Sequence, residues 1–390
     1  MPSTKNTSLD VDTVLEAFQN IKRATDDYIV KNHFDTFCSD FMPRASELAI
    51  AIFCNVFEEL GCPIRTAAAG DKLARIRHAP KHTKYVDYLY QVLDQNGGLV
   101  KIQDGYVIRT SAPCPSADID TTFDELLRDR PAQEAEIKLM RLTSRHFVRG
   151  LLGEVEAVNF LFGSSDGRLL LDRLYATAAS SKTVLDPLEA FMTEIGETWG
   201  SGNEPLKILE VGAGTGGTTQ RMLPALAALE GVPVQYSVSD LSAMLVSQAS
   251  KTFAQYPFVR YTVVDIEKEP EPQLLSSQHI ILGSNVLHAT RDLKLTLGNL
   301  HKMLRPDGFL VVHEMTAQML WADAAFGLIE GWWRFEDERT HVLQNSKAWK
   351  RVLTSAGFSS VDWTDGRRPE ARAQQLIFAM ASDPESLFAS

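Results

Sequence analysis

The run LKILEVGAGTGG at residues 206–217 constrains the fold most, because an apolar strand leads directly into a glycine-rich turn. Glycine tolerates positive φ and lets a ligand approach bare backbone. From this point the chain alternates between strand-like and helix-like segments, which predicts an α/β fold with a doubly wound, mostly parallel, seven-stranded sheet. The expected strands are 206–211, 234–239, 258–264, 279–283, 309–314, 359–363 and 375–380.

The first half of the chain has a different, mainly helical pattern. Two short β-rich runs within 99–110 surround Asp104-Gly105, a strong signal for a two-residue hairpin that gives this part a winged-helix-like character. We expect residues 1–198 to form a helical lid subdomain and 199–390 a Rossmann-like core, with the boundary in the segment WGSGNEP. The expected helices are 11–28, 45–60, 84–94, 132–152 and 184–198.

Composition excludes several classes of function. The formal net charge of −11 argues against nucleic acid as a partner, since that affinity comes from neutralising phosphates with cations. The N-terminus lacks the pattern of a signal peptide, and no apolar run approaches the ~18 residues that a membrane span needs. We therefore expect a cytoplasmic location without membrane contact. The four cysteines, with no CxxC spacing, are expected to be reduced, and no metal is expected.

The glycine spacing alone does not identify the ligand. Gly212, Gly214 and Gly217 satisfy GxGxxG, which also suits a nicotinamide or flavin dinucleotide. Glu210 separates the two hypotheses, because its carboxylate would repel a pyrophosphate but attract the cationic methionine part of S-adenosylmethionine. The turn therefore favours the sulfonium cofactor.

Two acidic residues follow the next two strands. Asp240, in VQYSVSDLS, can accept the ribose hydroxyls, as it could also do for a dinucleotide. Asp265, in YTVVDIEKEP, can accept the adenine amino group, with Ile266 as an apolar neighbour of the ring. The alternative is that each aspartate merely caps the end of a strand, but the ordered set spans the length of a nucleoside.

A candidate catalytic pair lies at the carboxyl ends of the fourth and fifth strands. These strands are expected to be neighbours, so His288 and Glu314 can face each other. His288 would act as a base, with Glu314 fixing its tautomer and stabilising the imidazolium. His313 is the rival, but adjacent side chains on a strand point to opposite faces, so His313 and Glu314 should not share the crevice.

The motifs EVGAGTG, VSD and VDIE, taken together, resemble those of class I S-adenosylmethionine-dependent methyltransferases over about residues 206–382. With SNVLHAT, HEMT and GWWRFED, the chain closely resembles the C-methyltransferase domain of fungal polyketide synthases, and its first half is more similar to the non-reducing branch. The predicted cofactor-binding residues are Glu210, Gly212, Gly214, Gly216, Asp240, Leu241, Asp265, Ile266 and Asn285.

The resemblance implies methylation of a poly-β-keto chain held as a phosphopantetheine thioester on an acyl carrier protein, with S-adenosylhomocysteine as the second product. His288 would remove the α-proton, and other polyketide synthase domains would be partners. The basic segment 70–84 is a candidate docking surface for the carrier, with a solvated loop as the alternative. The predicted substrate-contacting residues, for which core packing is the alternative, are Phe162, Tyr175, Trp332 and Trp333.

Two other functions fit part of the pattern. A histidine backed by a carboxylate also serves O-methyltransferases that act on phenols. A non-catalytic interaction module with a vestigial cofactor fold is a rival of another class. The residues expected of a working enzyme are present at all six key positions, which argues against a vestigial cofactor site. These residues are Glu210, Gly212, Asp240, Asp265, His288 and Glu314.

Overall fold

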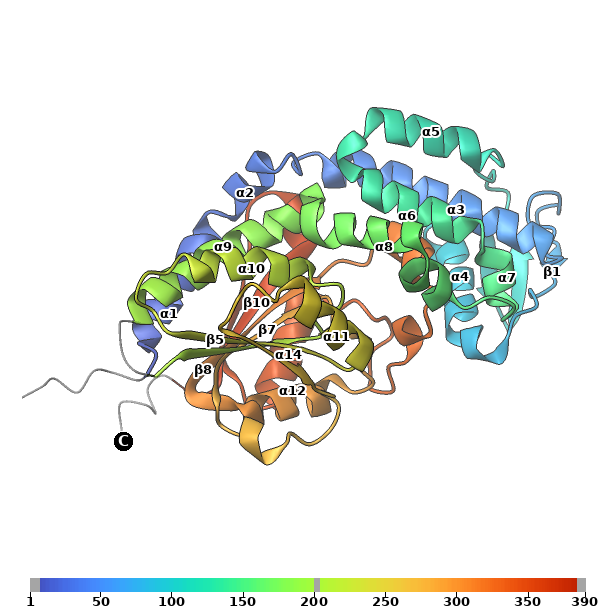
Figure 1. Ribbon diagram of the computed structural model, residues 1–390. Helices are drawn as coiled ribbons and strands as arrows, with labels where there is room; N and C mark the ends of the chain where they lie inside the picture. The colour runs from blue at the N-terminus through green and yellow to red at the C-terminus, as the bar shows by residue number, and fades with distance from the viewer. Residues whose placement is uncertain (1–7, 200–203, 384–390) are drawn as a thin grey trace, which may run out of the picture. The chain divides into compact units, whose positions relative to one another are not determined.

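The computed structural model describes residues 8–199 and 204–383, and packing divides the chain into two compact units (Figure 1). The first unit comprises the chain up to Asp35, Tyr175–Ala317 and the chain from Phe335 onward, while the second comprises Thr36–Leu174 and Gln318–Arg334. The units therefore do not follow the expected boundary at 198/199, because N-terminal helices pack on the sheet. Residues 200–203 of the expected linker lie outside the described residues.

The first unit contains a seven-stranded sheet with the order β6-β5-β4-β7-β8-β10-β9. The first five of these strands run parallel, and β10 is antiparallel to both β8 and β9. This topology confirms the predicted class I fold, and the strand order reverses beside β4, where ligands of such sheets bind. The strands are β4 (Leu206–Val211), β5 (Val234–Asp240), β6 (Val259–Val263), β7 (Gln278–Ser284), β8 (Leu304–Met315), β9 (Ser359–Trp363) and β10 (Gln374–Met380).

Helices cover both faces of this sheet (Figure 1). Alternate strand residues form two apolar cores, one under α1, α9 and α10 and the other under α12 and α14. The segment expected to be one helix at 11–28 is broken at Ala24 into α1 and α2. The helices are α1 (Val11–Arg23), α2 (Thr25–Lys31), α9 (Ala179–Trp199), α10 (Gly217–Ala227), α11 (Ala243–Thr252), α12 (Leu293–Met303) and α14 (Ser346–Ser355).

The second unit is mainly helical and carries the predicted hairpin. Asp104 and Gly105 both have positive φ, at 49° and 79°, as a two-residue turn between β2 and β3 requires. A short third strand, β1, was not predicted. The elements are α3 (Met42–Glu59), α4 (Thr83–Gln95), α5 (Ile119–Asp129), α6 (Glu134–Ser144), α7 (Phe147–Leu151), α8 (Ser165–Asp172), α13 (Leu320–Phe326), β1 (Lys72–Leu73), β2 (Val100–Gln103) and β3 (Tyr106–Arg109).

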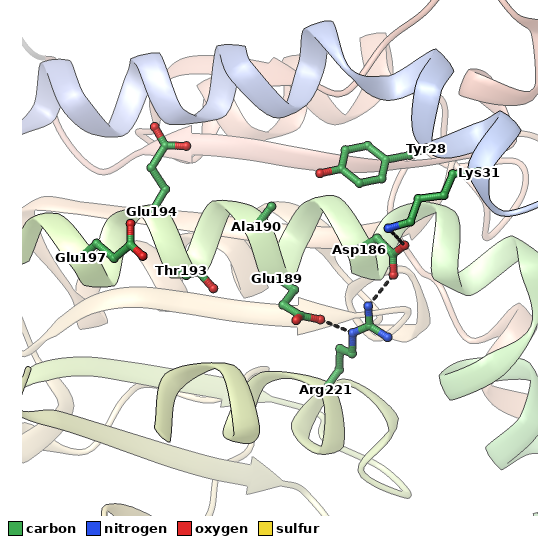
Figure 2. Close-up of a pocket in the computed structure, with 9 residues that line it drawn as sticks. All are labelled: Tyr28, Lys31, Asp186, Glu189, Ala190, Thr193, Glu194, Glu197 and Arg221. Atoms are coloured by element: carbon green, nitrogen blue, oxygen red, sulfur yellow. Dashed lines mark hydrogen bonds and ion pairs between the residues drawn. The ribbon is translucent and has the colours of Figure 1, made fainter. Parts of the chain in front are cut away.

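A buried carboxylate joins three helices of the first unit. Asp186 on α9 pairs with Lys31 at the end of α2 and with Arg221 on α10, and Arg221 also pairs with Glu189 (Figure 2). Asp186 also accepts a hydrogen bond from Asn32, which follows α2. The cluster lies along an open hollow of about 480 Å³ that Glu194 and Glu197 also line. Because α10 starts at the glycine turn, this ionic cluster fixes the helix that follows the turn.

We expect Asp186→Asn to lower the free energy of unfolding by about 1–3 kcal/mol, because two cations lose the charge that compensates them. The matched control is Glu197→Gln, which makes the same change on an exposed side chain of the same hollow and should cost less than about 0.5 kcal/mol. Urea unfolding of both variants measures the difference. Equal destabilisation would show that Asp186 has no special role.

Candidate active site

The glycine turn joins β4 to α10 through three residues with positive φ. Gly212, Gly214 and Gly216 have φ values of 62°, 57° and 90°, whereas Gly217 begins α10. The third essential glycine is thus Gly216 rather than the Gly217 of the GxGxxG pattern. A Cβ on Gly212 would lie 2.2 Å from Val286, so this glycine is also needed for the loop after β7 to pack against the turn.

Glu210 lies under the turn with its carboxylate buried in the protein. Its Oε2 accepts hydrogen bonds from Thr219 Oγ1 on α10 at 2.5 Å and from Tyr236 Oη on β5 at 2.9 Å. Burial raises the pKa of Glu210 to about 7, against the opposing effect of these two hydroxyls. The sequence did not indicate either hydroxyl partner, because the pattern places no constraint on which side chains surround a strand end.

The predicted nucleoside residues lie at the carboxyl ends of β5 and β6. Asp240 is held by two backbone amides, with Gly214 N donating to Oδ2 at 3.0 Å and Ser242 N to Oδ1 at 2.8 Å. The hydrogen bond from Gly214 connects Asp240 directly to the glycine turn. The next side chain, Leu241, is 60% exposed and offers an apolar surface beside the carboxylate.

The loop after β6 carries Asp265 and Ile266. Asp265 accepts a hydrogen bond from Glu267 N at 3.1 Å and pairs with Lys268, so the local cap that we considered as the alternative is present. Ile266 is buried, and its carbonyl accepts a hydrogen bond from Asn299 on α12. A contact of either residue with adenine stays a prediction.

Asn285 occupies a strained position just beyond β7. Its φ of 49° is in the left-handed region, its N–H donates to His313 O at 2.7 Å and its Oδ1 accepts from Met315 N at 3.3 Å. These bonds tie the end of β7 to β8. They direct the chain into the turn that carries the predicted base.

His288 and Glu314 meet as the sequence predicted. Nδ1 of His288, in a short 3₁₀ turn (Leu287–Ala289), lies 2.6 Å from Oε2 of Glu314 on β8, and both side chains are buried. The other carboxylate oxygen, Oε1, accepts from Leu287 N at 2.9 Å and from His288 N at 3.4 Å. One carboxylate thus orients both the imidazole and the turn that carries it.

His313 points away from this pair, as strand alternation predicts. Its ring bonds to Ser284 Oγ and to Gln374 Oε1, each at 2.9 Å. Burial lowers its pKa, although the Gln374 hydrogen bond opposes the shift. The ring is therefore an interior hydrogen-bonding group on the opposite face of the sheet from Glu314.

Tyr175 is the predicted substrate residue that belongs to the same unit as this pair. Its backbone and Cβ pack against Gly217, where an added Cβ would lie 3.2 Å away. Burial, followed by the charge of Glu314, raises the pKa of the Tyr175 phenol to about 12, so the ring stays neutral near the carboxylate. Tyr175 therefore packs against the start of α10, and its phenol feels the charge of Glu314.

The other three predicted substrate residues lie in the second unit. Phe162, in a π-helical turn (Asn159–Gly163), is 38% exposed. Trp332 and Trp333 are instead buried, with their Nε1 atoms donating to Asp323 Oδ1 and Gly327 O, and Trp333 stacks on Tyr85. The structure therefore favours the core-packing alternative for both tryptophans, whose indoles are held by residues of their own unit.

The residues around the turn fit S-adenosylmethionine. The glycines leave the backbone accessible to a ligand. The carboxylate of Asp240, which the turn holds in place, can accept hydrogen bonds from the two hydroxyls of a ribose, and the exposed side chain of Leu241 beside it can cover an aromatic ring. Within 8–199 and 204–383 no group of histidine, cysteine and acidic side chains is arranged to hold a metal ion. No helix in these ranges is long and apolar enough to cross a bilayer.

Two family models match the chain. Residues 19–107 match a methyltransferase helix-turn-helix domain, and residues 209–310 match a methyltransferase domain. The chain is 55% identical to non-reducing polyketide synthase AC of Didymella fabae over 382 residues, which cover 98% of this chain and 14% of that protein. It thus spans about one seventh of the length of this curated relative.

Two solved structures cover nearly the whole chain. The CMeT domain of the citrinin polyketide synthase is 45% identical, with a TM-score of 0.93 over 97% of this chain and 100% of that one. The carbon methyltransferase of CurJ is 25% identical, with a TM-score of 0.85 over 95% of this chain and 99% of that one. Both matches include the helical unit as well as the sheet.

The raised pKa of Glu210 predicts a pH-dependent stability. Because the folded pKa of about 7 exceeds the ordinary value of 4.5, the contribution of Glu210 to stability should be fully present below pH 4.5 and be lost as the pH rises towards 7. We expect the wild type to lose about 1–2 kcal/mol relative to Glu210→Gln between pH 5 and pH 7. Urea unfolding at several pH values measures this, and a constant difference would contradict it.

Proposed function

This chain belongs to the family of C-methyltransferase domains of polyketide synthases, and on that premise we propose that it methylates the α-carbon of a poly-β-ketoacyl thioester. The methyl donor is S-adenosylmethionine. One observation carries the proposal: the 2.6 Å contact between His288 and Glu314 provides a buried base at the strand ends that border the glycine turn.

The geometry of this pair suits removal of a proton from carbon. With Nδ1–H donating to Glu314, the lone pair of His288 lies on Nε2, which can accept the α-proton of a methylene between two carbonyls. Glu314 then stabilises the imidazolium and prevents the ring from turning. When bound, S-adenosylmethionine supplies an electrophilic methyl group, which the substrate carbon takes in an in-line displacement.

The glycine turn and its aspartates hold the donor in this proposal. Asp240 would accept the ribose hydroxyls, with Leu241 and Ile266 on either side of the adenine and Asp265 accepting from its amino group. Gly212, Gly214 and Gly216 would let the methionine part lie against the backbone, with Asn285 at the edge of the crevice. The buried carboxylate of Glu210 would balance the positive charge from beneath the turn.

The partners follow from the longer relatives. Because the chain matches about one seventh of a polyketide synthase, we place it among other synthase domains, with an acyl carrier protein that presents the substrate on phosphopantetheine in the cytoplasm. Tyr175, which packs against the start of α10, and the exposed ring of Phe162 are the predicted side chains that remain candidates for contact with the acyl chain.

The basic segment 70–84 is only partly available for carrier docking. Arg75 pairs with Asp87 at 2.9 Å and Lys81 pairs with Glu156, which reduces the positive charge presented to a partner. Lys72 lies on the ring of Tyr106 at 3.6 Å and remains exposed, as does Arg77. We therefore assign carrier attraction to these two exposed cations.

The direct test is to incubate the protein with S-adenosylmethionine and a β-ketoacyl thioester, then locate the added methyl by mass spectrometry and NMR. We expect it on the α-carbon. A methyl on oxygen would support the phenol-type alternative, and unmodified substrate with intact cofactor binding would support a non-catalytic module.

Replacing the base gives a second prediction. His288→Ala should lower turnover by at least about 100-fold with cofactor affinity nearly unchanged, since general-base catalysis contributes about 10²–10⁴-fold. His313→Gln is the matched control, because it removes a buried imidazole on the other face of the sheet and should leave the reaction intact. Calorimetric titration with S-adenosylhomocysteine checks affinity. Full activity of His288→Ala would eliminate this residue as the base.

Charge reversal tests carrier docking. The double variant Lys72→Glu/Arg77→Glu should raise the KM for carrier-bound substrate but not for a small thioester, because only the carrier-bound substrate includes an acidic protein that these cations can attract. Arg128→Glu, an exposed change on α5, is the control. Equal changes in KM for both substrates would contradict docking at this surface.

A further inference from the structure

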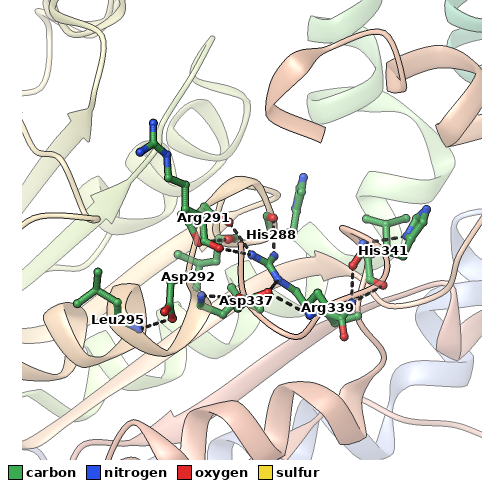
Figure 3. A network of polar contacts seen from close by, with 12 residues as sticks. His288, Arg291, Asp292, Leu295, Asp337, Arg339 and His341 are labelled. Carbon is green, nitrogen blue, oxygen red and sulfur yellow. Dashed lines mark hydrogen bonds and ion pairs between the residues drawn. The ribbon is translucent and has the colours of Figure 1, made fainter. Parts of the chain in front are cut away.

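We propose that Arg339 is a positioning residue that holds the His288 turn in its productive geometry, an inference that rests on the proposed role of His288 as the base. Arg339 comes from the loop between α13 and α14 and lies beneath this turn (Figure 3). It acts through backbone carbonyls and not on the substrate.

The guanidinium binds three backbone carbonyls, one in the turn and two in the residues that follow it. Its Nη1 donates to His288 O at 2.8 Å, and its Nη2 donates to Thr290 O at 2.6 Å and to Arg291 O at 3.3 Å. A planar fork with five N–H donors can hold several carbonyls at fixed angles, which a single ammonium on a flexible stem cannot do. The fork therefore defines the path of the backbone that carries the imidazole.

Arg339 is itself held rigidly. Its side chain is 6% exposed, and its Nε donates to Asp337 Oδ1 at 2.7 Å. The other oxygen of Asp337 accepts from Leu293 N, the first residue of α12, at 3.0 Å. Although burial alone would raise the pKa of Asp337, the Arg339 and Leu293 hydrogen bonds lower it below its ordinary value, so the pair stays ionic at neutral pH.

The turn is thus clamped from two sides by opposite charges. Glu314 accepts hydrogen bonds from the N–H groups of Leu287 and His288, while Arg339 donates to the backbone carbonyls from His288 onward. The two side chains hold opposite polar groups of the same backbone segment. Together they restrain both the contact of the imidazole with Glu314 and the path of the backbone that carries the ring.

This arrangement predicts a specific kinetic loss. A displacement of about 1 Å in a reacting group can cost about 100-fold in rate. Arg339→Lys retains the charge and most of the volume but loses the fork, so it should lower kcat by about 10–100-fold with little change in KM or in the Kd of S-adenosylhomocysteine. If Arg339 were needed only for folding, its replacement would lower the melting temperature and the active fraction but would not selectively slow proton removal.

Proton removal is measured separately from methyl transfer by α-hydrogen exchange. The β-ketoacyl thioester is placed in D₂O with the enzyme and S-adenosylhomocysteine, and deuterium incorporation above the uncatalysed background is followed by NMR. In Arg339→Lys the exchange rate per folded molecule should fall by the same factor as kcat. Asp337→Asn, which loosens Arg339 but retains its guanidinium, should produce a smaller loss in the same direction.

Arg109 supplies the matched control. It is also a buried arginine that holds loop carbonyls, those of Ile64, Leu99, Thr110 and Ala112, but in the helical unit. Arg109→Lys should lower the melting temperature with kcat and exchange within about twofold of wild type.

Exchange and kcat of Arg339→Lys within twofold of wild type would overturn the proposal. So would a loss that disappears after correction for the folded fraction. If Arg339→Lys does not fold, the kcat and the α-hydrogen exchange rate of Asp337→Asn test the proposal instead. Failure of the proposed function has a different signature, because His288→Ala would then retain full exchange whatever the Arg339 variants do.

Discussion

The contact between His288 Nδ1 and Glu314 Oε2 is the interaction on which the rest of the site depends. It exists because β7 and β8 are parallel neighbours, which brings their carboxyl ends together although 26 positions separate the two residues. The second oxygen of Glu314 holds the backbone of the same turn. A single buried carboxylate therefore holds both the imidazole and the backbone that carries it, and its burial makes these contacts strong.

Two buried acids lie on parallel strands that are separated by one strand of the sheet. Glu210 at the end of β4 faces α10 and β5, where Thr219 and Tyr236 hold it, while Glu314 on β8 faces the turn after β7. The first lies under the cofactor turn, and the second holds the proposed base. Since β7 lies between β4 and β8, the sheet itself sets the separation between the glycine turn and the proposed base.

Much of the fold could be predicted from the sequence because its signals are local. All seven strands of the main sheet and the Asp104-Gly105 hairpin lie where alternation and turn chemistry indicated. Helix ends were less predictable, since the break at Ala24 depends on packing. The sequence also did not show that α9 belongs to the unit that holds the sheet. The ion pairs of Asp186 on α9 are made with residues of α2 and α10, which are distant in the sequence.

For the candidate site, the sequence determined which chemical groups are present and at which strand ends they lie. Only the tertiary structure decided what surrounds each of them. Trp332 and Trp333 are buried within the helical unit, and two hydroxyls donate hydrogen bonds to the buried Glu210. Arg339 lies against the carbonyls of the His288 turn. The physical reason is that side-chain periodicity records which face a residue occupies, whereas its hydrogen-bond partners come from segments tens of residues away that no local pattern specifies.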